Sequence, residues 1–308
     1  MKKQKLSLRV ASVLALFILL VPMNVNAQYL RGDVDEDGKV NIQDVTSLID
    51  YLLRGTWEEE PIETQTETIM VNGIPIVMVR VDGGTFTMGA SGTDGAAAND
   101  EYPAHQVTLS SYWMCTTEVT QQLYRAVMGS NPSTNTGNAY PVESLTYSEC
   151  LSFITRLNAM TGKVFRLPTE AEWEFASRGG NNSKGYRYAG SDTANVVGWY
   201  YYNSLYSYSN KRYEHVVALK KPNELGLYDM NGNVYEWCSD WYGAYSYTAQ
   251  TNPKGPSSGT YRVIRGGNYN SYGSTEAICN DFRHSYRSKL DPTSKGSQYG
   301  MRLTATSL

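Results

Sequence analysis

The sequence of 308 residues predicts an α+β protein that is rich in loops and begins with a small calcium-binding loop and helix. Three observations lead to this prediction. Strand-like and helix-like segments follow one another from residue 76 to about residue 180, and the later residues have few periodic runs. A regularly spaced acidic loop precedes an amphipathic segment near residue 45. We therefore expect one large domain preceded by a small unit.

The first 27 residues have the pattern of a secretory signal peptide. Four basic residues precede an apolar run from Val10 to Pro22, and small and polar residues continue to Ala27. The run is short for a membrane span, nothing comparable follows it, and no cysteine lies near the cleavage site to accept a lipid. We expect a mature chain without a membrane span that is secreted, periplasmic or at the cell surface.

Loss of the signal peptide makes the chain clearly acidic. The whole chain has 27 Lys and Arg against 30 Asp and Glu, and removing four basic residues takes the formal net charge from −3 to −7. A chain of this charge is poorly suited to a phosphate backbone, so we expect no nucleic-acid partner. There are 25 Tyr but only 6 Phe, and tyrosine tolerates water while offering a large contact area.

Residues 28–54 form the small N-terminal unit. Its residues occupy the ligand positions of a calcium loop, namely Asp33, Asp35, Asp37, Lys39 through its backbone carbonyl, Asn41 and Asp44. Gly38 stands at the sharp turn of the loop. The unit resembles a single type I dockerin repeat, which implies calcium binding and a cohesin-type partner, although a solvated acidic turn is the alternative. An acidic linker, residues 55–70, leads to the main domain, residues 71–308.

Two strands and three helices are predicted at the start of the main domain. The strands are Ile76–Val81 and Gln106–Trp113, the second with alternating side chains on one face. One helix spans about Val119–Met128 and ends at Gly129. Thr146 with Glu149, and Thr169 with Glu172, form capping boxes that begin the other two, which end at Gly162 and at Gly179–Gly180.

Several ordered motifs of the main domain resemble those of formylglycine-generating enzymes. They are Gly83–Gly89, Thr117–Thr120, Arg166–Glu174, Gly226–Trp237, Arg262–Gly267 and Gly300–Leu303, and the match spans roughly residues 76–304. The resemblance implies the sulfatase-modifying-factor version of the C-type-lectin-like fold. It also implies oxidation of a cysteine in a Cys-x-Pro-x-Arg segment of a sulfatase by oxygen, with a copper ion held by two active-site cysteines.

The catalytic position departs from the family pattern. Ser271 stands where the resemblance places the first cysteine, and Cys279 fits the second. A hydroxyl is a poor ligand for Cu(I), which prefers thiolates, so oxidase activity and copper binding are in doubt. Cys279 is a candidate catalytic residue, or else a buried or disulfide-bonded thiol. Cys115, Cys150 and Cys238 are the other cysteines, and Cys150 shares a helix face with Ile154 and is expected in the core.

The resemblance also implies structural calcium in the main domain. Its ligands fall on Asp229, the backbone carbonyls of Gly232 and Val234, and Glu236. A carboxylate paired with an arginine is the alternative for Glu236. A second family site begins at Asn195 but has no clear downstream acidic ligand in this chain.

The tyrosines gather in segments typical of recognition loops. The candidate binding residues are Tyr200, Tyr201, Tyr202, Tyr206, Asn268, Tyr269, Asn270 and Tyr272. The sequence thus favours an exported protein that binds a protein or glycan at the cell surface. The alternatives are an active formylglycine-generating oxidase and a retroelement-diversified lectin-fold binding protein, which the last 45 residues also resemble. Tyrosines that merely pack against one another are the simpler interpretation.

Overall fold

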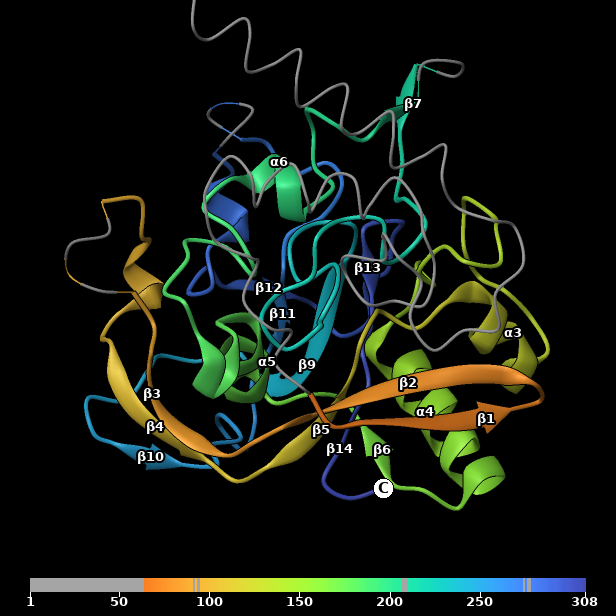
Figure 1. Ribbon diagram of the computed structural model, residues 1–308, viewed down its shortest axis with the longest axis horizontal. Helices are drawn as coiled ribbons and strands as arrows, with labels where there is room; N and C mark the ends of the chain where they lie inside the picture. The colour runs from red at the N-terminus through yellow and green to blue at the C-terminus, as the bar shows by residue number, and fades with distance from the viewer. Residues whose placement is uncertain (1–63, 91, 93–94, 207–209, 274, 276–277) are drawn as a thin grey trace, which may run out of the picture. The chain divides into compact units, whose positions relative to one another are not determined.

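The computed structural model describes residues 64–308 except 91, 93–94, 207–209, 274 and 276–277 (Figure 1). The predicted signal peptide and the calcium loop of residues 33–44 lie outside the described residues. Short strands and helices joined by many loops make up the domain, so the mixed α/β class is confirmed. Within the described residues, no helix combines the length and the apolar character needed to cross a membrane.

The described strands form four sheets. The five-stranded sheet has the order β1 (Thr66–Val71), β2 (Ile74–Val81), β5 (Tyr112–Cys115), β14 (Thr304–Ala305) and β6 (Phe165–Arg166). A three-stranded sheet contains β10 (Gln250–Thr251), β4 (His105–Leu109) and β3 (Gly84–Met88). A four-stranded sheet contains β12 (Ser288–Leu290), β11 (Arg262–Arg265), β9 (Tyr235–Trp241) and β13 (Tyr299–Gly300). β7 (Leu205–Tyr206) and β8 (Lys211–Arg212) form a separate hairpin.

The three predicted helices are present, with both predicted capping boxes and with Gly129 and Gly162 as C-caps, whereas the third helix has Arg178 as its C-cap, one residue before the predicted glycines. They are α3 (Gln121–Met128), α4 (Tyr147–Thr161) and α5 (Glu170–Ser177), and a short α6 (Ala194–Val197) and the 3-10 turns η1 (Asn99–Glu101), η2 (Gly180–Asn182) and η3 (Asn280–Phe282) accompany them. The Thr146 and Thr169 hydroxyls accept hydrogen bonds from the N–H groups of Glu149 and Glu172, and both capping boxes are complete. The caps therefore define the start of α4 and α5.

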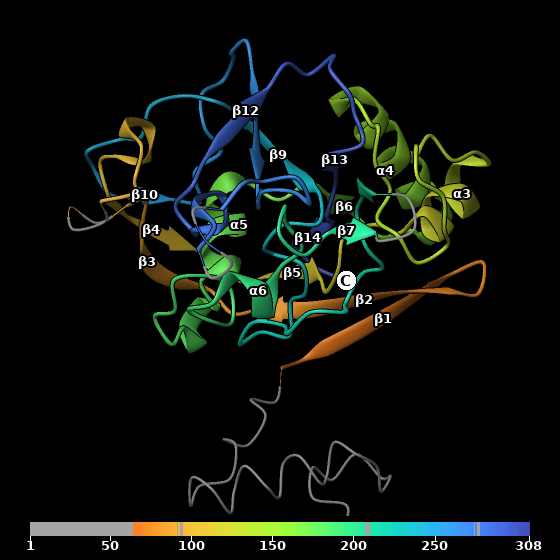
Figure 2. The same ribbon diagram turned by 90° about the horizontal axis from the view of Figure 1, so that it is seen from above.

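The C-terminal strand β14 lies between β5 and β6 in the five-stranded sheet and pairs with both. Helices α3 and α4 pack on this sheet through a large apolar cluster that includes Leu123, Phe153 and Leu157. Cys150 is fully buried there, as predicted. Figure 2 shows these helices and the three-stranded sheet on opposite sides of the domain. The four-stranded sheet, which contains β9, β11, β12 and β13, lies between them (Figure 2).

The predicted strand Gln106–Trp113 is wrong as a single element. It divides into β4 and β5, which belong to different sheets. At the break, the Ser110 N–H donates to Asn252 Oδ1 at 2.9 Å, and the Ser111 hydroxyl accepts from the Gly83 N–H at 2.9 Å. These side-chain bonds replace ladder bonds and turn the chain from one sheet into the next.

Buried arginine–glutamate pairs connect the sheets and helices. Their closest N–O distances are 2.6 Å for Arg265 with Glu174, 2.7 Å for Arg287 with Glu170, 2.6 Å for Arg283 with Glu101 and 2.7 Å for Arg302 with Glu236. Arg302 is fully buried, and it also donates to the carbonyls of Cys115 and Tyr228. Planar, multiply bonded guanidinium groups are suited to such dry sites.

Replacing Arg302 by methionine tests this network. Arg302→Met leaves the Glu236 carboxylate buried without its cationic partner, so we expect a loss of about 3–5 kcal/mol in the free energy of unfolding, measured with urea. The matched control is Arg80→Met, which removes an exposed pair with Asp82 and should cost roughly 0–1 kcal/mol. Equal losses in the two variants would contradict a structural role for the buried pair.

Candidate functional site

The segment after β11 carries the residues predicted for catalysis. Gly266 and Gly267 have φ angles of +95° and +75°, and a Cβ on Gly267 would lie 3.0 Å from the Phe282 ring. Glycine is therefore required where the chain turns out of the sheet. The turn that follows is closed by the Asn268 N–H, which donates to Ser271 Oγ at 3.1 Å. The Ser271 side chain is buried and faces inward.

The Ser271 hydroxyl belongs to a polar cluster. It forms a hydrogen bond with Asp281, to which Tyr286 and Tyr235 also bond. Burial is the largest influence and raises the pKa of Asp281, while the three hydroxyls lower it in part. Ser271 thus has hydroxyl and carboxylate neighbours, and no thiol belongs to this cluster in the described residues.

Cys279 lies in an apolar cluster just before η3. Its side chain is fully buried with Tyr188, Val197, Tyr200 and Phe282, and its N–H donates to the Tyr188 hydroxyl at 3.2 Å. Burial raises the pKa of the Cys279 thiol to about 12, so the thiol is protonated at neutral pH. Neither a protonated thiol nor a hydroxyl is a ligand that fits Cu(I), which prefers thiolates.

All four cysteines are buried and none forms a disulfide. Cys115 and Cys150 lie in the cluster under the five-stranded sheet, and Cys238 lies in a second cluster. In the described parts of the chain, Cys279 therefore shares its surroundings with no other cysteine, and no group of three or more His, Cys, Asp or Glu side chains is arranged to hold a metal ion.

Three tyrosines form an aromatic patch next to Ser271 in the fold. The rings of Tyr201 and Tyr272 are 4.7 Å apart, and Tyr202 lies 5.6 Å from Tyr272. Tyr272 is 65% exposed and Tyr202 is 37% exposed. The Tyr201 N–H donates to the Ser271 carbonyl at 3.1 Å, which attaches the patch to the turn below it. Arg212 stacks on Tyr201 at 3.5 Å.

The other predicted binding residues have different positions. Tyr200 is fully buried in the Cys279 cluster, and Asn268 and Tyr269 are also buried. Tyr206 is half-buried and stacks on His215, with ring centroids 4.7 Å apart. Asn270 is exposed beside the patch. The solvent-facing part of the predicted binding surface is thus the aromatic patch with Asn270.

Of the residues predicted for calcium in the main domain, Glu236 pairs with Arg302. Both oxygens of Glu236 accept from the Arg302 Nε, and Trp173 Nε1 donates to Glu236 Oε2 at 2.8 Å. Glu236 is therefore engaged in the arginine pair that was the alternative from sequence. Asp229 has one buried oxygen without a hydrogen-bond partner, and Glu118 has two.

Glu118 is the functional candidate that sequence reasoning missed. It is fully buried, and burial, followed by the charge of Asp229, raises its pKa well above the usual range. Burial also raises the pKa of Asp229 to about 6. Glu118 stands within the motif Thr117–Thr120, but neither the motif nor the local periodicity marked it as a buried acid facing Asp229. These open oxygens fit a hard cation.

The ammonium group of Lys220 contacts Asn195, the residue at which the second predicted calcium site begins. Lys220 Nζ donates to the Asn195 backbone carbonyl at 2.8 Å and lies over the Trp199 ring at 4.1 Å. The Asn195 side-chain oxygen accepts from Asn203 Nδ2 at 2.8 Å. Both oxygens of Asn195 are therefore occupied by donors from the chain.

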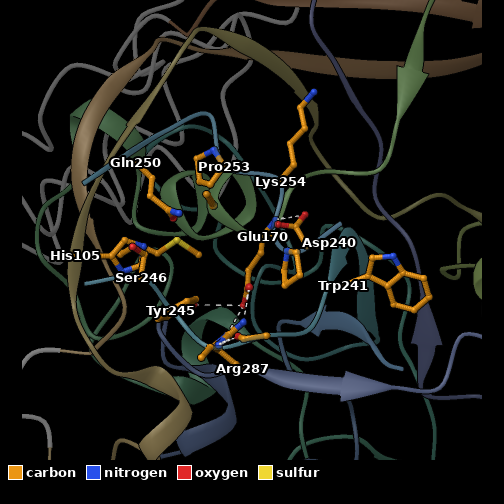
Figure 3. Close-up of a pocket in the computed structure, with 16 residues that line it drawn as sticks. His105, Glu170, Asp240, Trp241, Tyr245, Ser246, Gln250, Pro253, Lys254 and Arg287 are labelled. Atoms are coloured by element: carbon orange, nitrogen blue, oxygen red, sulfur yellow. Dashed lines mark hydrogen bonds and ion pairs between the residues drawn. The ribbon is translucent and has the colours of Figure 1, made fainter. Parts of the chain in front are cut away.

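A separate cavity of about 290 Å³ lies between α5, β9 and the loop before Gly255 (Figure 3). Glu170 and Asp240 supply two buried carboxylates to it. Glu170 pairs with Arg287, whereas Asp240 accepts from the Glu170 N–H and the Ser239 hydroxyl. Figure 3 shows the Lys254 side chain extending away from Asp240. No residue predicted from sequence lines this cavity.

Comparisons with known proteins agree with this fold. A family model described as the sulfatase-modifying factor enzyme 1-like domain matches residues 68–307. The chaperone protein LppX of Paenibacillus barcinonensis is 29% identical over 73% of this chain and 88% of the relative. A formylglycine-generating enzyme of Streptomyces coelicolor is 30% identical over 73% of this chain and 87% of the relative.

A solved structure and a longer relative extend the comparison. The structure of Treponema denticola variable protein 1 has a TM-score of 0.67 and 28% identity, covering 78% of this chain and 99% of that chain. The chain spans only 47% of the length of a Chlamydia caviae serine/threonine-protein kinase, pkn1, to which it is 28% identical. The likeness to that kinase is therefore confined to part of its length.

The Asp240 carboxyl is expected to make stability depend on pH. Burial, then the charge of Glu170, raises its pKa from 3.8 to about 7, so the folded chain binds an extra proton between these values. Its contribution to stability therefore falls as pH rises from 4 to 7. At pH 8, Asp240→Asn should be more stable than the wild type by up to about 4 kcal/mol in urea unfolding, with little difference near pH 4.

The control for this prediction is Asp82→Asn, because Asp82 is an exposed aspartate. That variant should show no comparable gain at pH 8. An Asp240→Asn protein that is less stable than the wild type at pH 8 would mean that the ionised carboxylate is the favoured form in the fold.

Proposed function

Because the chain belongs to the sulfatase-modifying factor enzyme 1-like domain family, we propose that it is an exported member that binds a protein or glycan at the cell surface through its aromatic patch. The observation that carries this proposal is the position of the patch. The rings of Tyr201, Tyr202 and Tyr272 contact one another, and the Tyr201 N–H bonds the carbonyl of Ser271, the position where the resemblance places the first copper-binding cysteine.

The chemistry beneath the patch supports binding rather than oxidation. Soft Cu(I) requires thiolate ligands, and this position offers the Ser271 hydroxyl and a buried, protonated Cys279. Exposed tyrosines, by contrast, bury much area with little loss of side-chain freedom when they meet a partner. Arg212, stacked on Tyr201, adds a cation that suits a carbonyl, carboxylate or sugar hydroxyl of the ligand.

We propose that calcium supports this domain at Asp229. The open oxygens of Asp229 and Glu118 suit a hard cation, and the backbone carbonyls of Gly232 and Val234 are the further ligands that the resemblance implies. In this proposal Glu118 supplies the second carboxylate ligand in place of Glu236, because the Glu236 carboxylate is paired with Arg302. The N-terminal loop Asp33–Asp44 is a separate calcium site in this proposal, with a cohesin-type partner.

Two other functions have support from particular relatives. The 30% identity with a formylglycine-generating enzyme favours a copper-dependent oxidase, with Cys279 as the remaining thiol. The likeness to Treponema denticola variable protein 1 favours a diversified binding protein. Sequencing many copies of the gene would test the diversified-binding alternative. In a diversified protein, sequence variation should concentrate in the codons for exposed residues such as Asn270 and Tyr272.

Removing the aromatic patch tests the binding proposal. We expect the labelled full chain to bind members of an array of glycans and cell-surface proteins, and the double variant Tyr202→Ala/Tyr272→Ala to bind about tenfold more weakly or worse. Tyr247→Ala is the matched control, because Tyr247 is 89% exposed and has no place in the patch. Equal binding by the double variant and the control would reject the aromatic patch as the binding surface.

A further inference from the structure

A second pair of buried acids lies away from Asp229 and Glu118. Glu143, in the loop before α4, and Glu214, after β8, are both fully buried. Neither oxygen of Glu214 has a hydrogen-bond partner, and Oε2 of Glu143 has none either. Three carboxylate oxygens are thus buried without a donor. Native proteins rarely leave such groups unsatisfied, because the loss of water around them is costly.

The two carboxylates face the same small region. The Asn135 N–H donates to Glu143 Oε1 at 3.3 Å, and the side-chain amide of Asn135 approaches Glu214 without reaching either oxygen at hydrogen-bond geometry. Tyr269 also lies near both, since the charges of Glu214 and Glu143 each raise the pKa of its hydroxyl after the larger effect of burial. Asn135 and Tyr269 therefore each lie close to both Glu143 and Glu214.

The backbone fixes one oxygen of Glu143. The N–H groups of Thr134 and Asn135 both donate to its Oε1, whereas Oε2 has no hydrogen-bond partner. Two ionised carboxylates that share a buried region repel each other unless a cation lies between them. Burial, with a contribution from Glu143, raises the pKa of Glu214 to about 8.

No positive side chain of the described residues compensates these acids. The buried arginines Arg265, Arg283, Arg287 and Arg302 pair with other glutamates, and no ion pair of the described residues includes Glu143 or Glu214. His215, the neighbour of Glu214, is half-buried and stacks between the rings of Trp199 and Tyr206, and desolvation lowers its pKa to about 4, so it is neutral. Among the described residues, the chain therefore supplies no cation to these two acids.

We propose that Glu143 and Glu214 bind a hard divalent cation, with calcium as the best fit. The three open oxygens of these two glutamates are the ligand type that calcium prefers, and two ionised carboxylates would balance its charge. This site is distinct from Asp229 and from the N-terminal loop, and it does not depend on the proposed binding function.

A cation bound by Glu143 and Glu214 would connect two segments of the domain that are far apart in the sequence. Glu143 belongs to the connection between α3 and α4, and Glu214 belongs to the segment that leaves the β7–β8 hairpin. The same two segments meet where the Val217 N–H donates to the Ala139 carbonyl at 3.0 Å and where the hydroxyls of Tyr140 and Tyr206 lie 3.2 Å apart. The cation joins the hairpin segment to the helical side of the domain.

Calcium binding to the full chain tests the proposal. Isothermal titration with calcium alone should give one equivalent fewer for Glu214→Gln than for the wild type, or an affinity at that site weaker by about tenfold or more. Glu67→Gln, at an exposed position of β1, is the matched control and should keep the wild-type isotherm. Magnesium in place of calcium should bind this site more weakly, because magnesium demands a stricter geometry.

Unchanged stoichiometry and affinity in both Glu214→Gln and Glu143→Gln would overturn the proposal and indicate that the two acids share a proton. A measurement on the unmodified chain covers the case in which the variants fail to fold. Crystals of the wild type soaked with terbium, a calcium substitute, should show an anomalous peak between Glu143 and Glu214. The absence of a peak at this position would also overturn the proposal.

Discussion

The rest of the domain depends on the ion pairs and hydrogen bonds of the Arg265 guanidinium. It is fully buried and pairs with Glu170 and Glu174 of α5. It also donates to the carbonyls of His284 and Tyr286 at 2.8 and 2.5 Å, so one side chain connects β11, α5 and the segment after η3. Because a buried guanidinium without these partners would be very costly, the three elements hold one relative position. The turn that carries Ser271 begins immediately after it.

The aromatic patch takes its position from this framework. The rigid turn after Gly267 presents the Ser271 carbonyl to the Tyr201 N–H, and Tyr272 follows in the chain. The patch is therefore attached to a turn that leaves the buried strand β11, and its exposed rings can differ without disturbing the core. The buried acids Glu118, Asp229, Glu143 and Glu214 lie outside the arginine pairs, and the cations that we propose would compensate their charges.

Local signals were enough to predict the helices but not the sheets or the acids. The Thr146 and Thr169 capping boxes each determine a helix start through bonds within four residues. β9 is buried almost throughout, so its sequence shows no alternation to detect, and the division of Gln106–Trp113 depends on Asn252, far along the chain. Ser271 and Cys279 were identified by resemblance. The burial of Tyr200, and of Glu118 and Glu214, follows from contacts between distant segments, which no local pattern records.

The most direct test of the central claim is an oxidation assay on the full chain. A synthetic Cys-x-Pro-x-Arg peptide is incubated with the protein, copper and oxygen, and its mass is followed over time. The binding account predicts no conversion of the cysteine thiol to an aldehyde, because Ser271 and the buried Cys279 do not provide two thiolates. Conversion by the wild type that disappears in Cys279→Ser would contradict it and identify the protein as an oxidase.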